Sequence, residues 1–246
     1  IQEMTLSVAL MGTDLIGQAR TGTGKTLAFA IPVIQRTVAP HDADYDQLVE
    51  PGKPQALIVA PTRELAIQVA GDVETASKNR GTRNLTICGG VPYEPQLEAL
   101  EAGVDIVVGT PGRILDLVNR GALDISHVKA VVLDEADEML DLGFLPDVEA
   151  LLARTPETRQ TMLFSATMPS AIITLARKHM RHPMNIRAES AESNQTVPAT
   201  SQYVWQAHEM DKPEVVARIL QADDVARVIV FTRTKRQAQR VADDLA

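Results

Sequence analysis

The sequence predicts an α/β fold in which helices cover both faces of a mostly parallel sheet. Three observations support this: short apolar segments alternate with helical patterns, a glycine-rich turn follows an early strand, and acidic residues follow a later one. Open sheets of this class bind their ligands at the carboxyl ends of the strands. A functional site is therefore expected at that edge.

The individual elements follow from local pattern. Strands are expected at short apolar runs, and helices at longer segments with helical periodicity. The predicted strands are 14–17, 56–60, 85–88, 105–109, 128–133 and 161–164, and the predicted helices are 27–31, 64–78, 95–101, 112–119, 145–153 and 169–179. The polar segment 38–54 contains several prolines and is expected to be a surface excursion.

The chain is expected to hold one domain and part of another. Residues 188–202 are polar without apolar periodicity, which indicates a linker after a first domain at 1–187. Residues 203–246 read as the opening of a second α/β unit, with a strand at 227–232, and are too few for an independent core. Because the chain starts without methionine, its natural N-terminus is expected to lie upstream.

Composition excludes several classes of protein. The single cysteine, Cys88, rules out an internal disulfide framework and fits a reducing cytosol, so a cytoplasmic protein is expected. No run of 18 apolar residues is present, so neither a transmembrane helix nor a membrane partner is predicted. The net charge of −8 lacks the usual basic footprint of nucleic-acid binding, yet a few arginines and amides can still contact phosphates.

An eight-residue stretch from Ala19, Ala-Arg-Thr-Gly-Thr-Gly-Lys-Thr, has the composition of a phosphate-binding turn. Gly22 and Gly24 let backbone N–H groups point inward, and the helix that follows adds its positive end. Lys25 can reach the β- and γ-phosphates, and the Thr26 hydroxyl can ligate Mg²⁺. The general pattern has glycine where this chain has Ala19. The alternative interpretation is an ordinary glycine-rich turn that binds no ligand.

Two carboxylates support the interpretation of that turn as a phosphate site. Asp134 directly follows the apolar run 128–133 and can hold Mg²⁺ through water, while Glu135 can orient and deprotonate an attacking water. An acidic helix start favoured by the helix dipole is the alternative, and it explains one carboxylate. Turn and carboxylates together predict an enzyme that binds and hydrolyses a nucleoside triphosphate.

Seven short motifs in this order resemble the first half of a DEAD-box ATP-dependent RNA helicase of superfamily 2. They are Gln2, 19–26 (ARTGTGKT), 61–66 (PTRELA), 89–90 (GG), 110–113 (TPGR), 134–137 (DEAD) and 165–167 (SAT). The resemblance covers residues 1–187 and implies a RecA-like P-loop domain, while 230–232 resembles the start of the second RecA-like domain, here incomplete. Within the family the chain is most similar to bacterial RhlE-type members.

The resemblance implies ATP and Mg²⁺ as cofactors. By resemblance the catalytic groups are Lys25, Asp134 and Glu135, and the metal is held by Thr26 and Asp134. Gln2 resembles the glutamine that reads the adenine edge. The remaining implied ATP contacts are Ala19, Thr21, Gly22, Thr23, Gly24, Lys25 and Thr26.

RNA contacts and their coupling to ATP are also implied by resemblance. The implied RNA-binding residues are Pro61, Thr62, Arg63, Gly90, Thr110 and Arg113. Two of these segments stand where a strand ends and a helix opens, so free N–H groups can meet phosphates without reading sequence. For Arg113, pairing with a nearby carboxylate is the alternative. Ser165 and Thr167 resemble hydroxyls that bind Asp137 and couple ATP to RNA; helix capping before Pro169 is the alternative.

The implied function is an ATP-dependent RNA helicase that grips RNA and locally unwinds or remodels it. The alternatives are an ATP-gated RNA-binding or assembly module without productive unwinding, and a DNA-directed translocase of superfamily 2. Proteins of RNA degradation or ribosome assembly are the expected partners besides RNA. The family's phosphate-stabilising arginines lie in the second domain and contribute about 10³–10⁵ in rate in comparable enzymes, so this chain alone is expected to hydrolyse ATP poorly.

Overall fold

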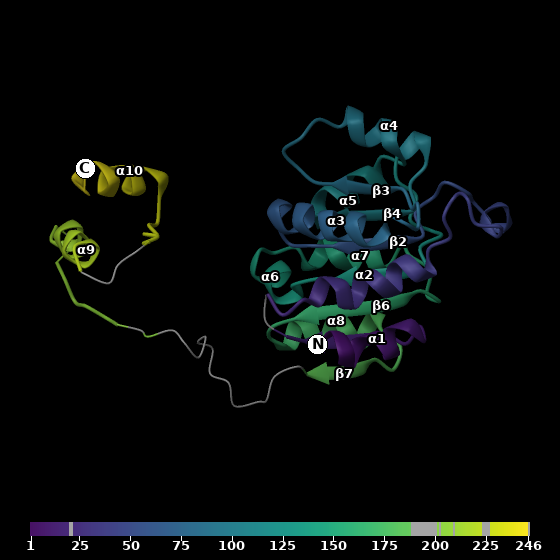
Figure 1. Cartoon of the computed structure of the whole chain (residues 1–246), viewed down its shortest axis with the longest axis horizontal. Helices are drawn as coiled ribbons and strands as arrows, with labels where there is room; N and C mark the ends of the chain where they lie inside the picture. Colours follow the sequence, from purple (N-terminus) through teal and green to yellow (C-terminus); the bar gives the residue numbers. More distant parts are fainter. Residues whose placement is uncertain (20–21, 188–200, 202, 209, 223–226, 246) are drawn as a thin grey trace. The chain divides into compact units, whose positions relative to one another are not determined.

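A seven-stranded parallel sheet forms the centre of the first part of the chain, with strand order β3-β4-β2-β5-β6-β1-β7 (Figure 1). The computed structural model describes residues 1–19, 22–187, 201, 203–208, 210–222 and 227–245. It divides into two compact units, Ile1–Glu192 and Ser193–Ala246. The predicted α/β class with a parallel sheet is confirmed.

All six predicted strands of the first unit are present. The strands are β1 Leu15–Gln18, β2 Ala56–Val59, β3 Asn84–Ile87, β4 Ile106–Gly109, β5 Ala130–Leu133, β6 Gln160–Ser165 and β7 Met184–Arg187. Strand β7 was not predicted. Among the described strands it pairs with β1 alone, at the sheet edge, and of its four residues only Ile186 is buried, so it lacks an apolar run.

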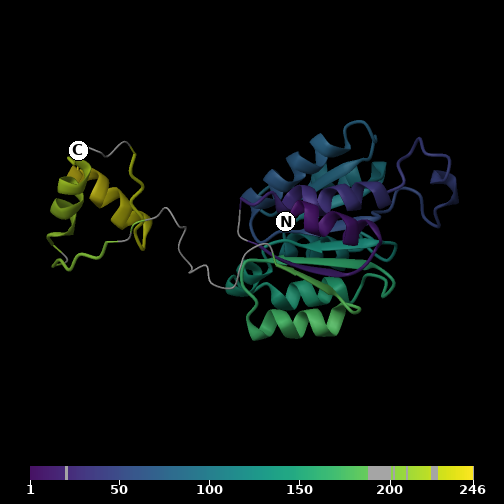
Figure 2. The ribbon, with the colours of Figure 1, turned by 60° about the horizontal axis from the view of Figure 1, so that its bottom comes forward.

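Helices cover both faces of this sheet (Figure 2). One face carries α1 Gln2–Leu10, α2 Lys25–Arg36 and α3 Arg63–Ser77; the other carries α5 Pro111–Asn119, α6 Ala136–Asp141, α7 Leu145–Leu152 and α8 Ser170–His179. Helix α4 (Glu94–Ala102) lies beside β3, and a short 3₁₀ helix, Tyr45–Gln47, belongs to the predicted excursion. Among the described helices none is long and apolar enough to cross a bilayer.

The continuous apolar strands are explained by burial on both faces. In β2, Leu57 and Val59 pack with the α5–α8 layer, while Ala56 and Ile58 pack with the α1–α3 layer. A strand with period-two alternation of apolar and polar residues would leave one face to water, whereas these strands have both faces buried. The parallel register aligns the carboxyl ends of these strands, so the residues that follow them lie along one edge of the sheet.

The second unit contains helices α9 Lys212–Leu220 and α10 Lys235–Leu245. The predicted strand at 227–232 is wrong for this structure, since these residues form no strand and Ile229 and Phe231 are 79% and 90% exposed. A strand needs a neighbour for its N–H and C=O groups, and the described residues of this unit offer none. Of the predicted linker 188–202, only Ser201 lies within the described residues.

Candidate active site

The glycine-rich turn joins β1 to α2 at the carboxyl edge of the sheet. Gly22 and Gly24 have φ of 83° and 78°, a backbone region that favours glycine. A Cβ on Gly24 would lie 2.5 Å from Nε2 of Gln2, whereas one on Gly22 would meet nothing within 4 Å. Ala19 is buried where the general pattern has glycine, and its N–H donates to the Ser165 carbonyl at 3.2 Å. Thr21 lies outside the described residues.

Gln2 comes from α1 and reaches this turn. Its Nε2 donates to the Gly24 carbonyl at 3.0 Å. The predicted adenine-reading residue and the predicted phosphate turn, which are far apart in the sequence, are therefore adjacent in the fold.

Lys25 begins α2 and is buried beside two carboxylates. The side chain is 6% exposed, and Nζ lies 3.7 Å from Asp134 Oδ1 and 3.8 Å from Glu135 Oε1. Nζ has no hydrogen-bond partner among the described residues. A buried ammonium has three donors to satisfy, and leaving them unmade is costly. At the positive end of a helix, this arrangement fits an anionic ligand that would supply the missing acceptors.

The two carboxylates follow β5 directly. Burial raises the pKa of Asp134 to about 6, against the opposing attraction of Lys25. Glu135 has a positive φ of 51°, which is uncommon for a residue other than glycine, and its N–H donates to Asp134 Oδ1 at 3.0 Å. Such strained backbone is typical of functional sites. The alternative of a plain acidic helix start accounts neither for the burial of Asp134 nor for the positive φ of Glu135.

A third carboxylate, Glu138, was missed from the sequence. Its hydrogen bond with Glu135 raises its pKa to about 7. The signal was available, because Glu138 stands three residues after Glu135 and faces the same side of α6.

A cavity of about 490 Å³ adjoins these groups. It is lined by Gly22, Gly24, Lys25, Thr26, Asp134 and Glu135, and by α3 residues that include Leu65, Gln68 and Asp72. This volume lies within the range of small-molecule sites. The α3 lining was missed because polar residues on a helix normally indicate a solvated face.

The donor set suits Mg²⁺ better than a metal held by protein alone. Among the described residues no group of three or more His, Cys, Asp or Glu could hold a metal ion. Mg²⁺ typically keeps several waters and takes one or two protein oxygens together with phosphate oxygens. Thr26 and Asp134, which line the same cavity, could supply those protein oxygens.

Asp137, Ser165 and Thr167 meet as predicted, between the ends of β5 and β6. The backbone N–H and Oγ1 of Thr167 both donate to Asp137 Oδ2 at 2.9 Å, and the N–H of Asp137 donates to Ser165 Oγ at 3.1 Å. Although burial raises the pKa of Asp137, these hydrogen bonds lower it overall. Helix α8 has Pro169 as its N-cap without a side-chain cap, so the capping alternative is wrong.

The predicted RNA-binding residues gather where β2, β3 and β4 end. Thr62 caps α3, its Oγ1 accepting from the N–H of Leu65 at 3.3 Å. Arg63 Nη1 donates to the Gly90 carbonyl at 3.5 Å, and the N–H of Thr110 donates to the Ile87 carbonyl at 3.0 Å. Pro61 lies at the same edge, immediately before Thr62.

Arg113 does not pair with a carboxylate, so that alternative is wrong. Its Nη2 donates to the Val91 carbonyl at 3.1 Å, and its Cζ lies 3.9 Å from the ring centroid of Tyr93. Within the described residues it makes no ion pair. Tyr93 was missed by sequence reasoning, because a lone tyrosine in a loop carries no motif.

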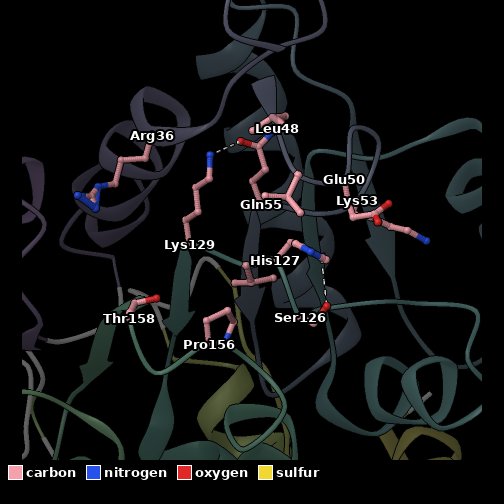
Figure 3. A pocket seen from close by; sticks show the side chains of 12 residues that line it. Arg36, Leu48, Glu50, Lys53, Gln55, Ser126, His127, Lys129, Pro156 and Thr158 are labelled. Carbon is pink, nitrogen blue, oxygen red and sulfur yellow. Dashed lines mark hydrogen bonds between the residues drawn. The ribbon is translucent and has the colours of Figure 1, made fainter. Parts of the chain in front are cut away.

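A second cavity, of about 340 Å³, lies at the amino ends of the strands (Figure 3). Its lining includes Gln55, Pro156 and Lys129, whose Nζ donates to Gln55 Oε1 at 3.1 Å. It contains none of the predicted site residues. The carboxyl edge is therefore the candidate active site.

Comparisons with known proteins agree with this geometry. A family model described as DEAD/DEAH box helicase matches residues 1–175. The chain is 44% identical to the DEAD-box ATP-dependent RNA helicase CshA of Geobacillus kaustophilus and 45% identical to the ATP-dependent RNA helicase DeaD of Escherichia coli K12. All of this chain is covered in both alignments, together with 50% of CshA and 37% of DeaD.

Solved structures show the same similarity. A crystal structure of a DEAD box protein from Methanococcus jannaschii is 38% identical with a TM-score of 0.69, covering 98% of this chain and 62% of that one. A hypothetical ATP-dependent RNA helicase from Sulfolobus tokodaii is 36% identical with a TM-score of 0.67, covering 76% of this chain and 51% of that one. The chain thus spans about half or less of the curated relatives it matches.

Proposed function

The chain belongs to the DEAD/DEAH box helicase family, and we propose that it is the ATP-binding and RNA-gripping part of an ATP-dependent RNA helicase. The names of its relatives CshA and DeaD favour this activity. The observation that carries the proposal is buried Lys25, which faces Asp134 and Glu135 across a turn with two positive-φ glycines. Such a site binds a polyphosphate and places carboxylates beside it.

Each group in the site has a proposed task. Lys25 binds the β- and γ-phosphates, Thr26 and Asp134 hold Mg²⁺, and Glu135 accepts a proton from the attacking water. When bound, Mg²⁺ neutralises charge on the phosphate oxygens. Glu138, which is hydrogen-bonded to Glu135, is proposed to orient that carboxylate. Proposed ATP contacts also include Gln2, Ala19, Thr21, Gly22, Thr23 and Gly24.

RNA is proposed to bind along the adjoining part of the same edge. Its sequence-tolerant contacts are assigned to Pro61, Thr62, Arg63, Gly90, Thr110 and Arg113. The hydrogen bonds of Asp137 with Ser165 and Thr167 support a coupling role, since they connect the element after the catalytic carboxylates to the element after β6. Strand β6 pairs with β1, which leads into the glycine-rich turn, so these contacts lie where they can respond to the bound nucleotide.

We extend the proposal to the domain boundaries, the location and the partners of the protein. Residues 1–187 are proposed as a first RecA-like domain, 188–202 as a linker and 203–246 as the beginning of a second RecA-like domain. A cytoplasmic location and partners from RNA degradation or ribosome assembly are also proposed. The assignment to RhlE-type members stays a prediction, because the relatives named above are CshA and DeaD.

The test is ATP turnover with and without single-stranded RNA, measured on the chain and on a version extended by a complete second RecA-like domain. RNA is expected to stimulate the extended version, while the chain alone hydrolyses slowly; DNA of the same sequence is the matched control. Stimulation by DNA instead would favour the translocase alternative. RNA-stimulated turnover without strand separation would favour the assembly module, and no response to either would contradict the proposal.

A further inference from the structure

Tyr93 lies at the centre of a small cluster on the RNA edge. It follows the glycine pair 89–90 and immediately precedes α4. The Arg113 guanidinium lies 3.9 Å from its ring centroid and the Arg120 guanidinium 4.5 Å. The Tyr93 hydroxyl donates to Asp116 Oδ2 at 2.6 Å. The Tyr93 ring thus contacts two guanidinium groups, and its hydroxyl is hydrogen-bonded to a carboxylate.

Helix spacing alone would favour a different arrangement. Arg113 and Asp116 are three residues apart on α5, a separation at which oppositely charged side chains commonly pair. Asp116 is instead occupied by the Tyr93 hydroxyl and by Arg120, whose Nε lies 3.0 Å from Oδ1. The hydrogen bonds from Tyr93 and Arg120 hold the pKa of Asp116 below its ordinary value. The tyrosine therefore contacts both groups, Arg113 through its ring and Asp116 through its hydroxyl.

The consequence is an arginine that makes no ion pair within the described residues. Arg113 Nη2 donates to the Val91 carbonyl, and its buried Nη1 has no hydrogen-bond partner within the described part of the chain. Arg63 donates to the preceding carbonyl, that of Gly90. Arg63 and Arg113 thus donate to consecutive carbonyl groups of the loop that carries Gly90. The Tyr93 ring stacks against Arg113.

We propose that Tyr93 is a positioning residue for RNA binding, which keeps Arg113 away from Asp116 and so fixes the 89–91 loop. This inference rests on the proposed function, because it assumes that RNA binds at this edge. Removing the ring while keeping an apolar side chain lets Arg113 move onto Asp116. The charge at the RNA edge is then neutralised and the loop loses its support.

The experiment measures binding of a fluorescent single-stranded oligouridylate to the chain by anisotropy. Tyr93→Leu is expected to raise the half-saturating concentration about fivefold, the scale of a partly buried cation–π contact. Tyr93→Phe keeps the ring and is expected to stay within about twofold of wild type. Tyr45→Leu is the matched control, since Tyr45 also carries an arginine, Arg83, 5.7 Å from its ring centroid, but lies in the excursion.

A double-mutant cycle shows whether the effect passes through Arg113. In an Arg113→Ala background, Tyr93→Leu is expected to weaken RNA binding no further. Circular dichroism checks folding, and Tyr93→Met replaces the leucine variant if that variant is unfolded. The inference is overturned if Tyr93→Leu binds like wild type, if Tyr93→Phe is equally weak, or if the two mutations add. Failure of the wild-type chain to bind RNA would overturn the proposed RNA edge itself, and this inference with it.

Discussion

Replacing Asp134 by asparagine should stabilise the ligand-free protein while disabling it. Asp134 is 3% exposed, and burial raises its pKa to about 6 from the ordinary value of 3.8 for an aspartate. An acid whose folded pKa is raised contributes most stability at low pH, where it is protonated in both states. That contribution is lost as the pH rises from the unfolded value through about 6.

The magnitude follows from the shift. The difference between about 6 and 3.8 corresponds to about 3 kcal/mol that ionised Asp134 costs the fold at pH 7, and to about half of that at pH 5. Asparagine keeps the acceptor for the Glu135 N–H without the charge. Asp134→Asn is therefore expected to raise the free energy of unfolding by up to about 3 kcal/mol at pH 7, and by less at pH 5.

The assay is urea unfolding at pH 5 and pH 7 without nucleotide or Mg²⁺. Far-UV circular dichroism is the appropriate signal, because the single tryptophan, Trp205, belongs to the second unit. Asp141→Asn removes an exposed carboxylate at the end of α6 and is expected to change stability by less than about 0.5 kcal/mol. A variant no more stable than wild type at pH 7, or a gain that does not grow with pH, would refute this reasoning.

Two further predictions concern the turn and the coupling contact. Gly24→Ala should cost about 1–2 kcal/mol of stability and weaken ATP binding, because Gly24 has a φ of 78° and closely faces Gln2; urea unfolding and nucleotide titration measure both. Gly71→Ala on α3, where a Cβ meets nothing within 4 Å, should instead stabilise the protein by up to about 1 kcal/mol. An equal loss of stability in the Gly24 and Gly71 variants would contradict the argument from the turn. Thr167→Val removes one of two hydrogen bonds to Asp137 and should lower RNA stimulation of ATP turnover in the extended version severalfold while ATP affinity stays unchanged; unchanged stimulation would contradict the coupling role.

The sequence predicted best where burial dictates the residue type. The runs at β2, β4 and β5 are apolar because both of their faces are covered, so the sheet and the placement of Asp134 at its carboxyl edge followed directly. Strand β7 was not predicted because an edge strand with one buried residue has no continuous apolar run. The apolar run 227–232 predicted a strand, but a strand forms only where a neighbour accepts its hydrogen bonds.

At the site, motifs predicted residue identity but not local contacts. The positions of Lys25 and Asp134 were predictable because phosphate and metal chemistry restrict both residue type and spacing. The left-handed backbone of Glu135 and its hydrogen bond with Glu138 depend on how α6 follows β5, which no motif encodes. The stacking of Arg113 on Tyr93 depends on two loops meeting in space, so sequence spacing alone could not find it.

The central claim is that buried Lys25 and its two carboxylates form a nucleotide site. Calorimetric titration of the chain with ATP and Mg²⁺ tests it most directly, using Lys25→Met beside Lys178→Met, whose exposed ammonium lies 3.5 Å from Glu149. Loss of charged hydrogen bonds to phosphate predicts at least about tenfold weaker binding for Lys25→Met and no change for Lys178→Met. Equal ATP affinity in wild type and Lys25→Met would contradict the account.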